Sequence, residues 1–286
     1  MTRKPVSPLI QPGDVQQTVT NLILGYPALI SGKHPLWTQA EYAAIMNPSV
    51  VLVELGYYEV LSAAVADKPT ALPDVSAFSG TYATLLTRLG ANGAKVIVTT
   101  IPDPFDTAYF TPIANAPAYL GASSSLLISL YGLTPNVYLS PTGLSAIGDQ
   151  LFSSLAYPPF LPAGITASAA TATAVKARVT ALNAAINTAA QAAGAKVYDL
   201  NGFFARLKAN GITVGNRTLT AAYLGGIYSL DGYYPGIIGQ AAIANDMLSF
   251  INTTYQTSYK SIDLTTLLSS DPAVRYTPSL RRQEVQ

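Results

Sequence analysis

The stretch YSLDGYYPGIIGQ, residues 228–240, places a carboxylate and two phenols close together in the chain. Asp231 lies two residues before Tyr233 and three before Tyr234, and Pro235 opens an amphipathic helix. A carboxylate at this distance can orient a neighbouring acid–base group, as in hydrolases that activate a serine. The chemical question is whether a phenol can be that group.

A phenol is a poor general base at neutral pH. Its reference pKa is about 10, against about 6.5 for imidazole, so roughly one phenol in a thousand is ionised at pH 7. Lowering the phenol pKa to about 7 would take about 4 kcal/mol of phenolate stabilisation. The negative charge of Asp231 would instead destabilise the phenolate and raise the pKa. We therefore expect a neutral Tyr234 that donates a hydrogen bond to Asp231 and does not act as a base.

Other residues with catalytic chemistry have structural interpretations. The only histidine, His34, lies in the loop sequence SGKHPLW, and its role as a displaced base is an open alternative. The serines of GASSS (121–125) and GLSAIG (143–148) do not fit a Gly-x-Ser-x-Gly nucleophile elbow and are interpreted as loop serines. Glu54 falls in a strand, and Glu59 is predicted to begin a helix, where an acid favours the helix dipole.

Composition excludes several classes of site and partner. The chain has one histidine and no cysteine, which removes disulfides, thiol nucleophiles, thiolate zinc sites and sites that need two histidines. Charged residues make up 11% and the net charge is +1, so no nucleic-acid partner is expected. We predict no metal and no cofactor.

The alternation of apolar runs and helical patterns predicts an α/β fold. The runs are nearly continuous and β-branched, as in parallel strands covered on both faces. Their alternation with helices indicates a doubly wound parallel sheet with its ligand at the carboxyl ends of the strands. The expected strands are 49–55, 94–101 and 195–200, and the expected helices are 74–90, capped by Asp74, then 167–193 and 236–253.

The chain is expected to form one domain over residues 1–264. Residues 102–166, rich in proline, glycine and serine, interrupt the alternation of strands and helices and are interpreted as a lid-like insertion. Residues 265–286 are interpreted as a loosely docked extension. No membrane span is predicted, because Glu54 and Glu59 interrupt the most hydrophobic window, and the basic start lacks the apolar region of a signal peptide.

Five motifs, in order and spacing, resemble the SGNH (GDSL-type) lipase/esterase family. The similarity runs from about Leu9 to Leu264. The resemblance implies a flavodoxin-like, doubly wound α/β fold, ester hydrolysis by a Ser–His–Asp arrangement, and secretion or another extracytoplasmic location. The motifs are LIQPGD (9–14), VVLVELGYYEVL (50–61), VIVTTIPDPF (96–105), AKVYDLNGFFARL (195–207) and LGGIYSLDGYYPGIIGQAAIAN (224–245).

The residues at the family's catalytic positions differ from the family's pattern. Gly13 stands at the place of the oxyanion glycine, but the chain before it leaves no room for the serine block and its strand. Tyr58 replaces the oxyanion asparagine and is bulky enough to fill part of the pocket, although its hydroxyl could also donate to an oxyanion. Asp231 takes the aspartate's place, and Tyr234 the histidine's.

Two functions follow from this pattern. In the first, the protein is an inactive relative of the esterases, and a remnant pocket binds a small molecule, a carbohydrate or a lipid-like ligand. Its aromatic rings could equally just plug the old pocket. In the second, it is an active ester hydrolase with altered catalytic residues, or with a nucleophile upstream of this chain. The expected ligand-binding residues are Gly56, Tyr57, Tyr58, Glu59, Tyr233 and Tyr234.

The missing first strand is a separate expectation about the sheet. Without it, an edge would lie open beside the Gly56 strand, and open edges favour pairing. Residues 5–10 could pair beside 50–55, or the tail or a second copy of the chain could fill the place, which would give a homo-oligomer. A start upstream of Met1 would restore the strand but would leave Tyr58 and Tyr234 unchanged.

Overall fold

A computed structural model describes residues 39–153 and 161–271, which divide into two compact units. Of the described residues, the first unit takes 39–56, Pro73–Thr100 and Ala181–Tyr198. The second takes Tyr57–Leu72, 101–153, 161–180 and 199–271. Gly13 and His34 lie outside the described residues, as does the region of the proposed first strand.

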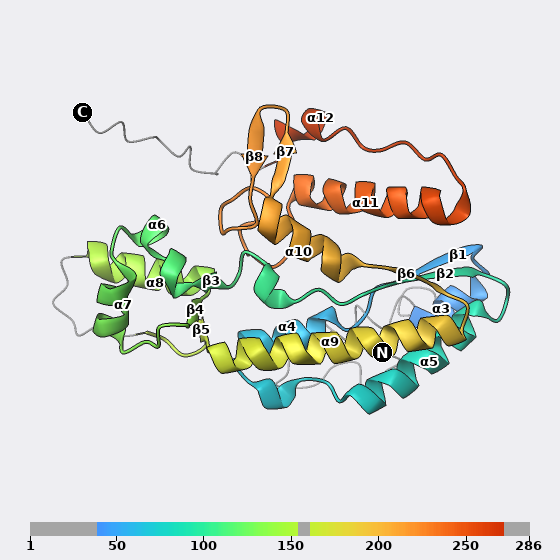
Figure 1. Ribbon diagram of the computed structural model, residues 1–286, viewed down its shortest axis with the longest axis horizontal. Coiled ribbons are helices and arrows are strands. Elements are labelled where there is room, and N and C mark those ends of the chain that lie inside the picture. The colour runs from blue at the N-terminus through green and yellow to red at the C-terminus, as the bar shows by residue number, and fades with distance from the viewer. Residues whose placement is uncertain (1–38, 154–160, 272–286) are drawn as a thin grey trace, which may run out of the picture. The chain divides into compact units, whose positions relative to one another are not determined.

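The first unit contains a parallel sheet, as the alternating pattern predicted. Its strands are β1 (Val50–Val53), β2 (Lys95–Thr99) and β6 (Lys196–Tyr198), and β2 lies between the other two (Figure 1). Val51 pairs with Val96, and Val98 with Val197. The three predicted strands are therefore confirmed, each within its predicted range. The described chain is of mixed α/β class.

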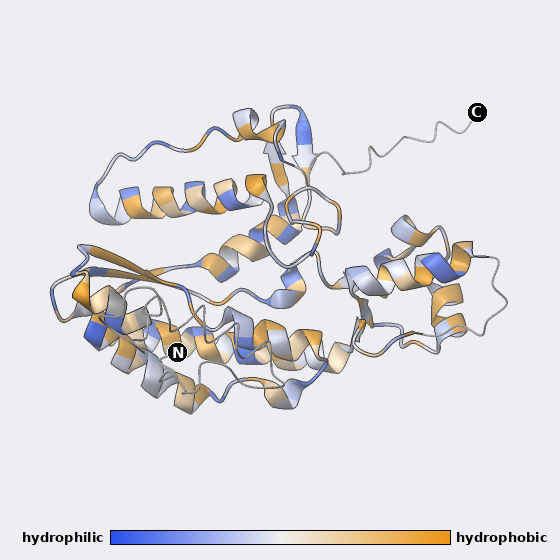
Figure 2. Ribbon diagram, turned by 180° about the vertical axis from the view of Figure 1, so that it is seen from behind, coloured by the Kyte–Doolittle hydropathy of each residue, from blue (hydrophilic) through white to orange (hydrophobic). Residues whose placement is uncertain are grey.

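The expectation of strands covered on both faces is right for β2 and wrong for β1. In β2, Val96 to Thr99 are all buried. Strands β1 and β2 are both mostly hydrophobic (Figure 2), yet Val50 and Leu52 of β1 are each 51% exposed. Residues two apart in a strand share a face, so one face of β1 is open while Val53 on the other is buried. Hydrophobicity alone did not distinguish an edge strand from a central one.

Helices complete the first unit. Helix α5 (Val75–Gly90) begins where the sequence predicted, because the Asp74 Oδ1 accepts a 2.8 Å hydrogen bond from the Ala77 N–H. Helix α3 (Gln39–Ile45) packs against α5, and α5 packs against β2. The C-terminal half of α9 (Ala169–Ala192) buries apolar side chains at helical spacing, namely Leu182, Ile186 and Ala190.

In the second unit, the segment predicted as an insertion has its own small core. A short antiparallel sheet joins β3 (Thr111–Pro112), β4 (Tyr138–Leu139) and β5 (Thr166–Ala167). The helices beside it are η2 (Pro104–Asp106), η3 (Ile113–Asn115), α6 (Pro117–Leu120), α7 (Ser124–Tyr131) and α8 (Pro141–Phe152). Buried apolar residues of η3, α6, α7, β4 and α8 form one cluster that includes Ile113, Leu127, Leu139 and Ile147.

The rest of the second unit carries the YSLDGYYPG stretch. It contains α4 (Tyr57–Val65), η1 (Pro69–Ala71), α10 (Leu200–Asn210) and the hairpin of β7 (Ile212–Val214) with β8 (Arg217–Leu219). Helix α11 (Ile237–Tyr255) follows the stretch, and α12 (Leu264–Leu268) packs against α11 and β7. Within residues 39–153 and 161–271, no helix has the length and apolar character to cross a membrane.

Gly56, where the chain passes from the first unit into α4 of the second, has a backbone conformation that residues with side chains disfavour. It is buried, with φ at +102°. This conformation gives the glycine of the LGYYE motif a structural reason to be glycine, independent of any ligand.

We predict that Gly56→Ala lowers the free energy of unfolding by more than about 1 kcal/mol, because alanine is strained at this φ. Gly80→Ala is the matched control. Gly80 lies inside α5 with open space where a Cβ would stand, so alanine there should raise stability by about 0.5–1 kcal/mol. Urea unfolding monitored by circular dichroism measures both. Equal stability of Gly56→Ala and the unmodified protein would contradict the assignment.

Candidate functional site

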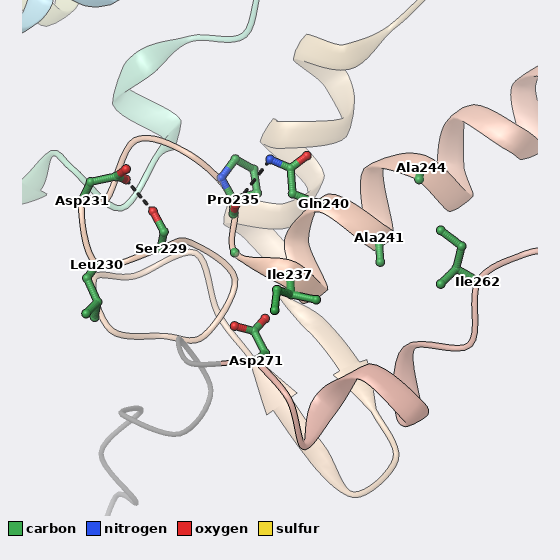
Figure 3. A pocket seen from close by; sticks show the side chains of 11 residues that line it. Ser229, Leu230, Asp231, Pro235, Ile237, Gln240, Ala241, Ala244, Ile262 and Asp271 are labelled. Carbon is green, nitrogen blue, oxygen red and sulfur yellow. Dashed lines mark hydrogen bonds between the residues drawn. The ribbon is translucent and has the colours of Figure 1, made fainter.

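Asp231 organises the turn between Tyr228 and Pro235 through one carboxylate oxygen. Its Oδ1 accepts hydrogen bonds from the Ser229 hydroxyl at 2.7 Å, the Tyr233 N–H at 2.8 Å and the Tyr234 N–H at 3.1 Å. Figure 3 shows the Ser229 and Asp231 side chains pointing toward one another. An aspartate that accepts from backbone N–H groups two and three residues later is a common device for holding a turn.

The expected hydrogen bond from the Tyr234 phenol to Asp231 does not form. The backbone N–H of Tyr234 donates to Asp231, and the side chain of Tyr234 is 49% exposed. The local turn already supplies three donors to the oxygen, so the phenol is not needed to satisfy it. The prediction was wrong about which group of Tyr234 meets the carboxylate.

The turn is held against the chain segment at Tyr109. Gly232 has φ at +75°, and a Cβ on it would lie 2.9 Å from both the backbone N and the Cα of Tyr109. Only glycine permits this approach. The next residue, Tyr233, stacks its ring on that of Tyr109, with centroids 4.0 Å apart and planes 16° from parallel. Tyr109 is a site residue that sequence reasoning missed.

The environment of Tyr233 holds its phenol in the protonated form. Burial is the largest cause that raises its pKa well above the usual value, and the neighbouring phenol of Tyr109 and the charge of Asp231 act in the same direction. This phenol therefore donates a proton less readily than a tyrosine in water, which makes it a less effective acid–base group.

Asp271 caps helix α11 from a distant part of the sequence. Gly236, at the N-cap position, has no side chain to offer, and the Asp271 Oδ2 accepts a 2.7 Å hydrogen bond from the Ile238 N–H instead. Asp271 is 1% exposed. A carboxylate there complements the positive end of the helix dipole. The two residues are 33 positions apart, so no local motif signals the contact.

An open groove of about 990 Å³ lies between the turn and helix α11 (Figure 3). Most of its lining is apolar, and Leu230, Ile237 and Ile262 are each at least 40% exposed. Its charged residues are two carboxylates, and no lysine or arginine lines it among the described residues. The lining residues are Ser229, Leu230, Asp231, Pro235, Gly236, Ile237, Gln240, Ala241, Ala244, Ile262 and Asp271.

The tyrosines of the LGYYE motif lie in the first turn of α4. Glu59 is also in that turn, as predicted for an acid at a helix start. Tyr58 is 53% exposed and is not among the residues that line the groove. Tyr57 lies close enough to the buried Tyr228 for the two phenols to interact electrostatically. That Tyr57, Tyr58, Tyr233 and Tyr234 line one ligand-binding site stays a prediction.

The candidate serines are placed differently from the loop interpretation. Ser123 caps helix α7, with its hydroxyl accepting from the Leu126 N–H. Ser145 lies inside helix α8, on an exposed turn, so the interpretation of 143–148 as a loop was wrong. A serine within a regular helix lacks the sharp turn that projects a nucleophile.

The site offers a serine hydroxyl in contact with a carboxylate, but in the described residues it has no imidazole between them. Also within those residues, no three carboxylates or histidines gather in a way that could hold a metal ion. No family model, curated protein or solved structure matches this chain.

The raised pKa of Tyr233 predicts a loss of stability at alkaline pH. Above about pH 10 the unfolded chain releases this proton and the folded chain retains it, so folding becomes less favourable as the pH rises. We expect the unfolding free energy of the unmodified protein to fall more between pH 9 and pH 11 than that of Tyr233→Phe. Tyr259→Phe, at a 59% exposed tyrosine, is the control and should follow the unmodified protein. An equal fall in all three proteins would contradict the assignment.

Proposed function

We propose that this protein is a relative of the SGNH/GDSL-type hydrolases that binds an uncharged, apolar ligand in the groove beside α11 and does not hydrolyse esters. The observation that carries the proposal is the use of Asp231. Its Oδ1 is occupied by three donors of its own turn, so this oxygen serves the fold of the turn.

Neither neighbouring tyrosine supports base catalysis. The pKa of Tyr233 is raised, and Tyr234 meets Asp231 through its backbone N–H and not through its phenol. The Ser229 hydroxyl donates directly to Asp231 at 2.7 Å. A carboxylate that accepts a serine proton without an intervening imidazole is a much weaker activating device than a triad.

The groove's lining favours an apolar ligand over a carbohydrate. Its volume of about 990 Å³ is at the upper end of the usual range for small-molecule sites, and its exposed side chains form the kind of apolar patch that marks a binding surface. Sugar recognition by stacking needs an open aromatic face. One face of Tyr233 is already covered by Tyr109, and Tyr234 is not among the lining residues.

Charge restricts the ligand further. The groove carries Asp231 and Asp271, and its described lining offers no cation to receive an acidic headgroup. A fatty acid anion would meet repulsion there. A neutral amphiphile such as a fatty alcohol or a monoacylglycerol could place its chain along Ile237 and Ala244 and its hydroxyl near Gln240.

The resemblance to the SGNH/GDSL family supports a further proposal, that the protein is located outside the cytoplasm. It also supports a homo-oligomer, because β1 is an end strand of the described sheet and its edge away from β2 could pair with a second copy of the chain. Both extensions depend on the family assignment and are independent of the groove.

We predict that 1-octanol binds and that p-nitrophenyl octanoate is not hydrolysed. Binding measured by saturation-transfer NMR should weaken roughly five- to tenfold in Ile237→Ser, because an apolar contact is lost. Leu126→Ser is the matched control, since Leu126 is 48% exposed and lies outside the groove. Octanoate should bind more weakly than octanol at pH 7. Release of p-nitrophenol should equal that in buffer alone.

Two results would contradict the proposal separately. Ester turnover that is abolished by Tyr234→Phe or His34→Ala, or labelling by a fluorophosphonate, would show that the protein is a hydrolase. Tighter binding of octanoate than of octanol, or equal losses in Ile237→Ser and Leu126→Ser, would show that the groove is not the binding site even if hydrolysis is absent.

A further inference from the structure

A second cavity in the same unit carries a different set of groups. It has a volume of about 430 Å³, within the range of small-molecule sites, and shares no lining residue with the groove beside α11. Its charged lining consists of Asp103, Asp106, Lys176 and Lys208, which come from η2 and its N-cap, from α9 and from α10. Nothing in the proposed function uses these residues.

Lys208 and Asp106 form the fixed part of this charge cluster. The Lys208 Nζ donates to the Asp106 Oδ1 at 2.8 Å and to the backbone oxygen of Phe105 at 3.0 Å. The carboxylate side of the pair is mostly covered, with 19% of the side chain exposed. These contacts hold η2 against α10 and leave one of the three N–H groups of the ammonium for another acceptor.

Asp103 is held in place by hydrogen bonds, but only one of its two carboxylate oxygens accepts one from a described residue. Its N–H donates to the Asn201 Oδ1 at 3.1 Å, and its own Oδ1 accepts from the Phe105 N–H at 3.0 Å. No described residue donates a hydrogen bond to the other carboxylate oxygen. Burial is the largest cause that raises the pKa of Asp103, and Asp106 adds to it, while the Phe105 N–H, Lys208 and Lys176 oppose the rise.

Lys176 brings the second ammonium to the cavity. It is exposed, and within the described chain its Nζ makes no hydrogen bond, although its charge acts on Asp103. The cavity lining therefore offers a carboxylate oxygen of Asp103 as an acceptor, and N–H groups of Lys176 and Lys208 as donors. A ligand that both donates and accepts hydrogen bonds could satisfy all three.

The balance of charge selects the class of ligand. Two carboxylates and two ammonium groups line the cavity, so an anion would meet Asp103 and Asp106, and a cation would meet Lys176 and Lys208. A neutral molecule with several hydroxyls avoids both conflicts, because each hydroxyl can donate to a carboxylate and accept from an ammonium. We propose that this cavity is a binding site for a neutral, polyhydroxylated ligand of the size of a mono- or disaccharide.

Apolar residues of the same lining suit the apolar face of such a ring. Phe105 and Tyr138 meet edge to face, with centroids 4.8 Å apart, and Ile113 and Val137 lie beside them in the lining. Aromatic and aliphatic walls with a few placed polar groups are the usual composition of a small-molecule site.

The test titrates the whole protein with D-glucose, D-xylose and N-acetyl-D-glucosamine as probes. Acetate and ethanolamine serve as charged comparison ligands. Amide chemical shifts should change saturably with at least one sugar, at residues that include Asn136 and Thr173 of the lining. Asp103→Asn should weaken that sugar at least tenfold, because a charge-assisted hydrogen bond is lost. Lys176→Met, which keeps the aliphatic stem, should weaken it about fivefold.

Asp149→Asn and Lys260→Met are the matched controls, since both residues are exposed and lie outside the cavity. They should bind as the unmodified protein does, and thermal unfolding should show that all four variants are folded. The proposal is overturned if no sugar produces saturable shifts, if acetate or ethanolamine binds more tightly than every sugar, or if the controls lose as much affinity as Asp103→Asn. These outcomes do not depend on octanol binding or ester hydrolysis.

Discussion

A single carboxylate oxygen sets the geometry of the candidate site. The Asp231 Oδ1 accepts from one side chain and two backbone N–H groups, and this fixes the turn that leads into α11. The same turn brings Gly232 against the backbone of Tyr109 and stacks Tyr233 on the Tyr109 ring. In a serine hydrolase the aspartate would orient an imidazole. Here its strongest contacts are local, and they build a wall of the groove.

The two cavities differ in what they can hold. The groove beside α11 is open and mostly apolar, and its charges are carboxylates alone. The cavity near η2 is smaller and balances two carboxylates with two ammonium groups. Both sets of groups are suited to holding a neutral molecule, and in the groove Ser229 contacts the Asp231 carboxylate directly, with no described imidazole between them. Binding without covalent chemistry is therefore a consistent account of both.

The sequence was informative where a local pattern determines the structure. Continuous β-branched runs located all three parallel strands, and the Pro73–Asp74 pair located the start of α5. Contacts between distant residues left no such pattern. Asp271 caps α11 across 33 positions, and Lys208 meets Asp106 across 102. The exposed face of β1 was missed because its residues are as hydrophobic as those of the buried strand beside it.

The stability of Asp231 variants tests most directly whether this carboxylate serves the fold. Asp231→Ala removes the acceptor of three hydrogen bonds and should lower the unfolding free energy by about 1–2 kcal/mol. Asp231→Asn keeps an oxygen in the same place and should retain most of the stability, because asparagine holds such turns as well. If Asp231→Ala unfolds at the same denaturant concentration as the unmodified protein, the residue is not the structural anchor described above.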